Sequence, residues 1–172
     1  MLMQQEHQYQ IGDWVVHIEH GVGQIKDQEK RFRAGEDRIF LKAVTFTGIF
    51  WFPAGKADEA YMRPVVSIEE MHRALAALEE PPEDLPDTAK ERDEAISRAK
   101  SDISLERTVK IIRDLHGESV LDEITTAEEL FLIKFKKEFA SELSVVKGED
   151  IEKAEEIMEN ALAVGISKVT DK

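Results

Sequence analysis

The sequence has 172 residues, of which 42% are hydrophobic, so it is long enough for one large domain or two small ones with a packed core. It contains no cysteine, which excludes disulfides, cysteine nucleophiles and thiolate metal ligands. No stretch is apolar over the ~18 residues of a membrane-spanning helix, and the first ten residues lack a basic start and an apolar signal core. We therefore expect a cytoplasmic protein with no membrane partner.

The net charge of −13 is unevenly distributed along the chain. Residues 1–66 carry eight Lys or Arg and nine Asp or Glu, and the other 15 basic and 27 acidic residues give residues 67–172 a net charge of −12. A field of that sign repels phosphates, so it disfavours unaided binding to nucleic acid and favours a protein partner.

The first predicted elements lie between Ile11 and Ile25 (IGDWVVHIEHGVGQI). An apolar run from Trp14 to Val16 predicts a strand, and a turn with Gly21 and Gly23 follows, because glycines take positive φ without a steric penalty. We expect Trp14 to pack in the core. This compact arrangement is typical of a small, strongly bent sheet.

Two further strands are predicted at Arg38–Val44 and Thr47–Phe52, closed by Pro53, with a polar loop at Lys30–Asp37 before them. The pattern predicts a meander of four or five short strands. Ile49–Phe52 contains four consecutive apolar residues, which cannot all face one side of a strand. One alternate pair should face outward and offer a binding surface, although a core position for Trp51 is an alternative.

The rest of the sequence has helical spacing. Ser67 and Glu70 form a predicted capping box before a helix that ends at the Pro81-Pro82 pair, and a solvated linker follows. Later helices are expected after Ser104, ending near Gly117, after Thr126, paired with Glu129 in a capping box, and after Gly148. The Thr126 helix should centre the core of a compact bundle through Leu130, Phe131, Phe135, Phe139 and Leu143. The predicted divisions are residues 1–66, 67–86 and 87–172.

The sequence resembles the RNA polymerase-interacting domain shared by bacterial CarD-type transcription regulators and the transcription-repair coupling factor, and beyond it the helical domain of CarD proteins. The resemblance covers nearly the whole chain. The segments that carry it are Ile11–Ile25, Phe52–Ala54, Met62–Val65, Ile111–Leu115, Thr126–Glu129 and Ser141–Leu143.

The resemblance implies an α+β protein, in which a small SH3/Tudor-like β-barrel precedes an all-α bundle. It also implies that the barrel binds the RNA polymerase β subunit by strand augmentation. Arg31 and Trp51 lie where the family places partner-contacting side chains, and Ile49 and Pro53 complete the predicted polymerase-binding set.

In the family, the helical domain touches promoter DNA and a tryptophan wedges into the minor groove. Ala89 occupies that place here, so no aromatic wedge is available. Lys90, Arg92 and Arg113 are the best candidates for DNA contacts. Because 11 acidic and ten basic residues share residues 90–137, a solvated face of mixed charge is the alternative.

The sequence nominates no catalytic, cofactor or small-molecule site. His17, Glu19 and His20 suggest a metal site, but on a strand and turn we expect the two imidazoles to point apart, with His20 shaping the turn. We therefore predict a non-enzymatic transcription regulator that binds polymerase and carries a helical domain near promoter DNA. The alternative is a protein-interaction adaptor that does not bind DNA.

Overall fold

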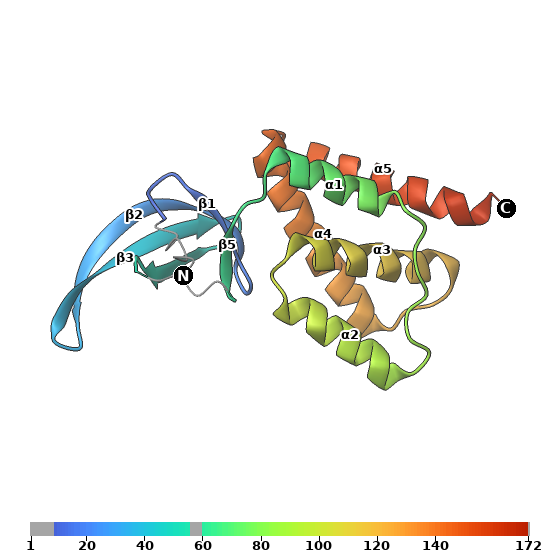
Figure 1. Cartoon of the computed structure of the whole chain (residues 1–172), viewed down its shortest axis with the longest axis horizontal. Coiled ribbons are helices and arrows are strands. Elements are labelled where there is room, and N and C mark those ends of the chain that lie inside the picture. The colour runs from blue at the N-terminus through green and yellow to red at the C-terminus, as the bar shows by residue number, and fades with distance from the viewer. Residues whose placement is uncertain (1–8, 56–59, 172) are drawn as a thin grey trace, which may run out of the picture. The chain divides into compact units, whose positions relative to one another are not determined.

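The computed structural model describes residues 9–55 and 60–171 and falls into two compact units, Met1–Val65 and Val66–Lys172 (Figure 1). Within the described residues, the first unit is an antiparallel sheet of β1 (Trp14–His17), β2 (Gly21–Arg33), β3 (Glu36–Thr45), β4 (Ile49–Pro53) and β5 (Met62–Pro64). The second unit contains helices.

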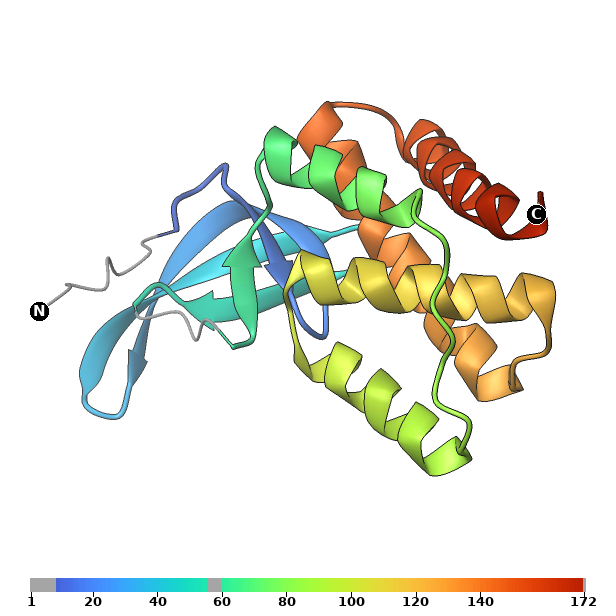
Figure 2. The same cartoon turned by 45° about the vertical axis from the view of Figure 1, so that its right-hand side comes forward.

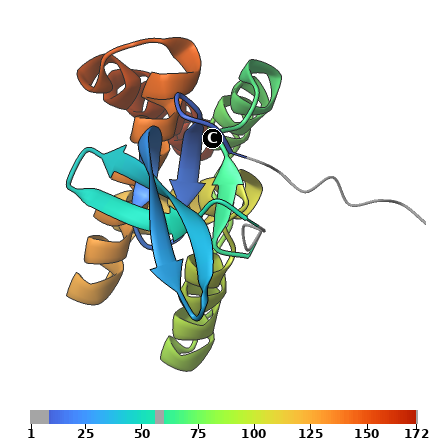
Figure 3. The same cartoon turned by 90° about the vertical axis from the view of Figure 1, so that its left-hand side faces the viewer.

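The sheet has the strand order β4-β3-β2-β1-β5, so β4 and β5 form its two edges. The predicted SH3/Tudor-like β-barrel does not close: the sheet is open, although it curls strongly, as Figure 3 shows. Closure would need β4 to pair with β5, and β5 has three residues that end at Pro64, which lacks an N–H donor. One face of the sheet holds the core of this unit: Val15, Ile25, Leu41, Ala43, Phe50 and Met62.

The predicted loop at Lys30–Asp37 is instead the end of a long hairpin. Arg33 pairs with Glu36, so the connection contains two residues, Ala34 and Gly35. Their φ angles are 54° and 83°, as a type I′ turn requires at both central positions. The strands thus continue through residues that the polar composition assigned to a loop.

Two predictions for the first hairpin need correction. Gly21 has the expected positive φ of 72°, but Gly23 lies in strand β2, where an added Cβ would be 3.2 Å from the carbonyl oxygen of Val44. Gly23 therefore permits close strand packing. Trp14 is half-buried outside the core, because Val15 takes the inward position of β1.

The second unit contains α1 (Ile68–Leu78), α2 (Ala89–Ser101), α3 (Leu105–Leu121), α4 (Thr126–Lys147) and α5 (Ile151–Thr170) (Figure 2). α3 packs against each of the other four. No helix within residues 9–55 and 60–171 has the length and apolar character needed to cross a membrane. The largest fully buried side chains of this unit are Met71, Leu78, Ile112, Leu115, Phe139, Leu143 and Leu162.

The caps explain where these helices begin. Ser67 and Glu70 form the predicted capping box of α1. The box of α4 lies one residue earlier than predicted, at Thr125 and Glu128. The buried stripe of α4 runs through Glu128, Leu132, Phe135, Phe139 and Leu143, so Leu130 is 63% exposed and was wrongly placed in the core. Gly148 ends α4 in the left-handed conformation, with φ of 66°.

The proline-rich segment after α1 differs from the expected solvated linker. Leu85 is 8% exposed and belongs to the helical core. Pro82 packs against Gly117, where an added Cβ would clash with the proline ring. This contact accounts for the glycine inside α3, which continues to Leu121 past the predicted end near Gly117.

Candidate functional site

Strand β4 presents its side chains to both faces of the sheet. Phe50 and Phe52 pack in or against the core, whereas Ile49, Trp51 and Pro53 lie on the opposite face, which we call the outer face. Ile49 is 58% exposed and Trp51 is half-buried. The predicted outward pair is thus Ile49 and Trp51, and β4 is an edge strand.

The hydrogen-bond pattern of β4 determines which main-chain groups point to its free side. The N–H of Thr45 donates to the carbonyl of Gly48 and that of Ala54 to the carbonyl of Ile39, at 2.8 Å each. Antiparallel ladders alternate between bonded and non-bonded pairs, so the N–H and C=O groups of Ile49 and Trp51 point away from β3. Pro53 occupies the next such position and needs no hydrogen-bond acceptor for its nitrogen.

Two of the predicted polymerase-binding residues, Arg31 and Trp51, meet on the outer face. The guanidinium carbon of Arg31 lies 4.5 Å from the centroid of the Trp51 ring and 5.3 Å from that of Phe40. Nη2 of Arg31 also donates to Oε2 of Glu29 at 3.0 Å. Lys42 approaches the Trp51 ring to 5.9 Å. Arg31 thus contacts Glu29 on its own strand, Phe40 on β3 and Trp51 on β4, and Lys42 on β3 approaches the same tryptophan ring.

Sequence reasoning missed Phe40 and Lys42 as members of this cluster. Both are direct sequence neighbours of the core residues Leu41 and Ala43, so their position in an alternating strand already indicated the outer face. Their contact with Trp51 depends on the β3–β4 register, in which Lys42 pairs with Trp51 and Phe40 with Pro53.

The two histidines of the first turn do not point apart, as the sequence suggested. The rings of His17 and His20 are 4.6 Å apart, and His20 stacks on Phe50 at 4.7 Å. The Nδ1 atom of His17 accepts hydrogen bonds from the N–H groups of Glu19 and His20. Burial, followed by the nearby His20, lowers the pKa of His17. In the described parts of the chain, no three His, Cys, Asp or Glu side chains are placed to hold a metal.

The predicted DNA contact Arg92 forms an ion pair inside the helical unit. Its Nε and Nη2 donate to the two carboxylate oxygens of Glu128 at 2.8 and 3.1 Å, and its side chain is 18% exposed. The hydrogen bond from Arg92 lowers the pKa of Glu128. Arg92 thus joins α2 to the capping box of α4, and a phosphate contact would have to break a bidentate pair.

Arg113 also forms an ion pair within the helical unit, in this case with its sequence neighbour Asp114. Its Nε donates to Oδ1 of Asp114 at 2.8 Å, and its side chain is 13% exposed. The same carboxylate oxygen accepts the N–H of Glu83, so the pair also holds the proline-rich segment on α3. The structure therefore does not assemble Arg92 and Arg113 into one exposed basic patch.

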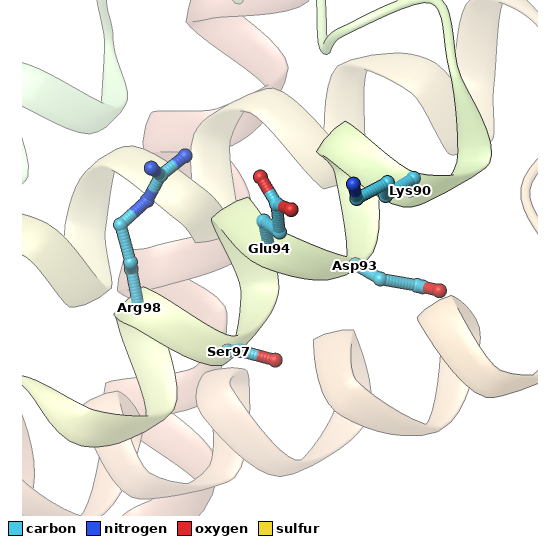
Figure 4. Close-up of a pocket in the computed structure, with 5 residues that line it drawn as sticks. All are labelled: Lys90, Asp93, Glu94, Ser97 and Arg98. Carbon is cyan, nitrogen blue, oxygen red and sulfur yellow. The ribbon is translucent and has the colours of Figure 1, made fainter.

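Lys90 is the exposed member of the predicted DNA-binding set. It lies with Glu94 and Arg98 along one side of α2, beside an open hollow that Asp93 and Ser97 also line (Figure 4). Two positive and two negative side chains line this hollow, so its lining has no net charge to attract a phosphate. Ala89, the residue expected from the resemblance in place of the wedge tryptophan, is exposed at the first position of α2.

A family comparison bears on the first unit. Residues 9–66 match the CarD-like/TRCF RID domain, an RNA polymerase-interacting domain. The match spans all five strands of the sheet, including edge strand β4 and the cluster around Arg31. The first unit of this chain is therefore a domain of the CarD-like/TRCF RID family, a class of transcription-related domains that interact with RNA polymerase.

Proposed function

We propose that this protein is a non-enzymatic transcription regulator that binds the β subunit of RNA polymerase by adding a partner strand to β4. The observation that carries the proposal is the free side of β4, where the main-chain groups of Ile49 and Trp51 point away from β3. Main-chain hydrogen bonds to such an edge supply affinity, and adjacent side chains supply specificity. Trp51 and Arg31 lie on the outer face beside this edge and would contact side chains of the added strand.

The test compares two substitutions at one position. Ile49→Pro removes the N–H that points away from β3, whereas Ile49→Ala removes most of the side chain and keeps the N–H. If strand addition holds the complex, Ile49→Pro should weaken binding of the full chain to core polymerase about 5-fold beyond Ile49→Ala, the value of one hydrogen bond. Titration by biolayer interferometry, with circular dichroism to confirm folding, measures the difference. Equal affinities would contradict strand addition at this edge.

Side-chain contacts require a second pair of variants. Arg31→Glu should weaken binding by at least ~1 kcal/mol, because the reversed charge would face whichever oxygen the guanidinium meets. Trp51→Ala should also weaken binding. If Arg31→Glu and Trp51→Ala both bind with the affinity of the unsubstituted protein, the outer face does not contact the polymerase.

The function of the helical unit has two candidates. In the first, polymerase binding holds this unit near upstream promoter DNA, and a high effective concentration replaces intrinsic affinity. Lys90, Arg92 and Arg113 would then be the phosphate contacts. The second is an adaptor that recruits protein and does not bind DNA. The ion pairs of Arg92 with Glu128 and of Arg113 with Asp114 favour the second candidate.

A footprint of the polymerase–promoter complex discriminates the two candidates, since both predict little binding of the free protein to duplex DNA. The adaptor should not bind duplex DNA at low salt, and its complex with polymerase should contact upstream DNA no differently from polymerase alone in a footprint. A tethered DNA contact would extend the footprint and lose the extension with Lys90→Glu. In either case we expect the protein in the cytoplasm, associated with the nucleoid through polymerase.

A further inference from the structure

Arg31 reaches its tryptophan partner along a diagonal path across the sheet. It stands on β2 opposite Arg38, whereas Trp51 stands on β4 opposite Lys42. Phe40 lies between Arg38 and Lys42 on the same face of β3, because alternate residues of a strand share a face. The arginine side chain therefore crosses over Phe40 before its guanidinium lies over Trp51, in agreement with the distances of 5.3 and 4.5 Å.

Three neighbours restrict this guanidinium in different directions. The guanidinium carbon lies over the rings of Phe40 and Trp51, and Glu29 accepts a hydrogen bond from Nη2. A guanidinium has five N–H donors in a rigid plane, so donors remain for a partner after one is used. Restricting the rotamers of a long side chain before association reduces the entropy lost on binding.

We propose that Phe40 is a positioning residue of the polymerase-binding face, which acts through Arg31 by supporting its guanidinium over Trp51. This inference rests on the proposed function, since Arg31 must itself contact the polymerase. It predicts that the aromatic ring of Phe40, more than its apolar volume, determines how well Arg31 binds.

The experiment measures affinities of full-length variants for core polymerase. Phe40→Leu keeps an apolar side chain and removes the ring, so we expect binding to weaken about 3- to 10-fold, the range for the entropy lost when one long side chain is fixed on binding. Phe40→Tyr keeps the ring and should restore the affinity of the unsubstituted protein. Phe46→Leu is the matched control, since Phe46 is an exposed phenylalanine outside this cluster, and it should leave binding unchanged.

A double-mutant cycle separates positioning from a purely structural role. If Phe40 acts through Arg31, adding Phe40→Leu to Arg31→Ala should cause no further loss. The Nε–Hε resonance of Arg31 in the free protein should also move when Phe40→Leu removes the ring current. An equal loss in both backgrounds, or an unmoved resonance, would overturn the proposal.

The outcomes also distinguish this proposal from the one on which it rests. Lost binding with Arg31→Ala and unchanged binding with Phe40→Leu would overturn the role of Phe40 alone. Absence of polymerase binding by the unsubstituted protein would overturn both.

Discussion

Ala34 is the non-glycine residue with a positive φ among those that the structure describes. Its φ of 54° lies in the left-handed region, where a Cβ crowds the following carbonyl. The two-residue connection between Arg33 and Glu36 requires this conformation, because type I′ turns match the twist of the flanking strands. The long β2–β3 hairpin therefore contains a local strain that the sequence could remove.

The first prediction follows from this strain. Ala34→Asn should stabilise the sheet by about 0.5–1 kcal/mol, because asparagine adopts the left-handed region more readily than alanine. Urea unfolding followed by tryptophan fluorescence measures the change, since Trp14 and Trp51 both lie in the first unit. As a control, Gly35→Ala should destabilise the same turn, where φ is 83°. Stability that falls with Ala34→Asn would contradict the argument.

A second prediction concerns His116 of α3. Nζ of Lys136 lies 3.1 Å from its Nδ1 and 2.9 Å from Oε1 of Glu159. The ammonium has only donors, so Nδ1 accepts a hydrogen bond from it and the imidazole is neutral. Burial and then Lys136 lower the pKa of His116 below its usual value of 6.5, against the opposing effect of Glu159.

Because the folded state favours the neutral imidazole, this stabilisation is complete above pH 6.5 and is lost as the pH falls through the lowered pKa. Urea unfolding followed by circular dichroism at ~222 nm, a wavelength that reports helix content, should show lower stability at pH 5.5 than at pH 7.5. His116→Gln replaces the accepting ring nitrogen with an amide oxygen that does not titrate in this range, and it should flatten the difference. A pH dependence that survives this substitution would assign the effect to other groups.

At the scale of elements, charged side chains join segments that are distant in the sequence. Arg92 connects α2 to the start of α4, and the carboxylate of Asp114 on α3 binds the N–H of Glu83. Glu142, buried on α4, accepts the N–H of Val66 at 3.0 Å and so fixes the start of the helical unit. The carboxylates of Asp114 and Glu142 thus accept hydrogen bonds from main-chain N–H groups that lie outside the helices and strands.

The third prediction compares two basic residues of α2. Arg92→Met should destabilise the helical unit by about 2 kcal/mol, because it leaves the buried carboxylate of Glu128 without its bidentate partner. Lys90→Met, on the exposed side of the same helix, should change stability by less than about 0.5 kcal/mol. Urea unfolding followed by circular dichroism measures both. Similar values for the two variants would indicate that the Arg92 pair contributes little.

How far the sequence predicted these elements depends on the kind of signal. Alternation in Ile49–Phe52 predicted that one alternate pair of side chains faces outward, because one strand determines its own periodicity, but it did not decide which pair. The Arg92–Glu128 pair was missed, because it joins residues 36 positions apart and no local pattern encodes their distance. Composition was misleading at Lys30–Asp37, where polar residues suggested a loop but both sides of a solvated hairpin arm are polar. The core position predicted for Leu130 was wrong because the buried stripe of α4 passes through Leu132, so the predicted stripe was in the wrong register within an apolar run.

At the scale of the whole molecule, the sheet unit and the helical unit make separate contributions to the proposed regulation. The sheet unit belongs to a polymerase-interacting family, whereas the helical unit has a net charge of about −12 and internal ion pairs at two of the three predicted DNA contacts. Polymerase binding would therefore determine where the protein is, and the helical unit would determine what it does there.

The fourth prediction tests the missing wedge. Ala89 is exposed at the start of α2, and Leu85, the nearest large aliphatic side chain before it, is buried in the core and unable to replace an aromatic wedge. The unsubstituted protein should lengthen the lifetime of promoter open complexes little. Ala89→Trp should lengthen it if the helical unit reaches the edge of the transcription bubble, because the ring could fill an unstacked step. Heparin-challenge decay of open complexes measures both, and strong stabilisation by the unsubstituted protein would contradict the prediction.

The hydrogen-bond alternation of β4 also bears on the colloidal behaviour of the protein. Copies of a protein with a long bare edge strand can stack into fibrils, because each added copy presents the same ladder again. In β4 the outward N–H groups belong to Ile49 and Trp51, and Pro53 interrupts the ladder at the next position. A ladder this short is a poor template for indefinite stacking, yet it still suits one partner strand whose side chains match the outer face.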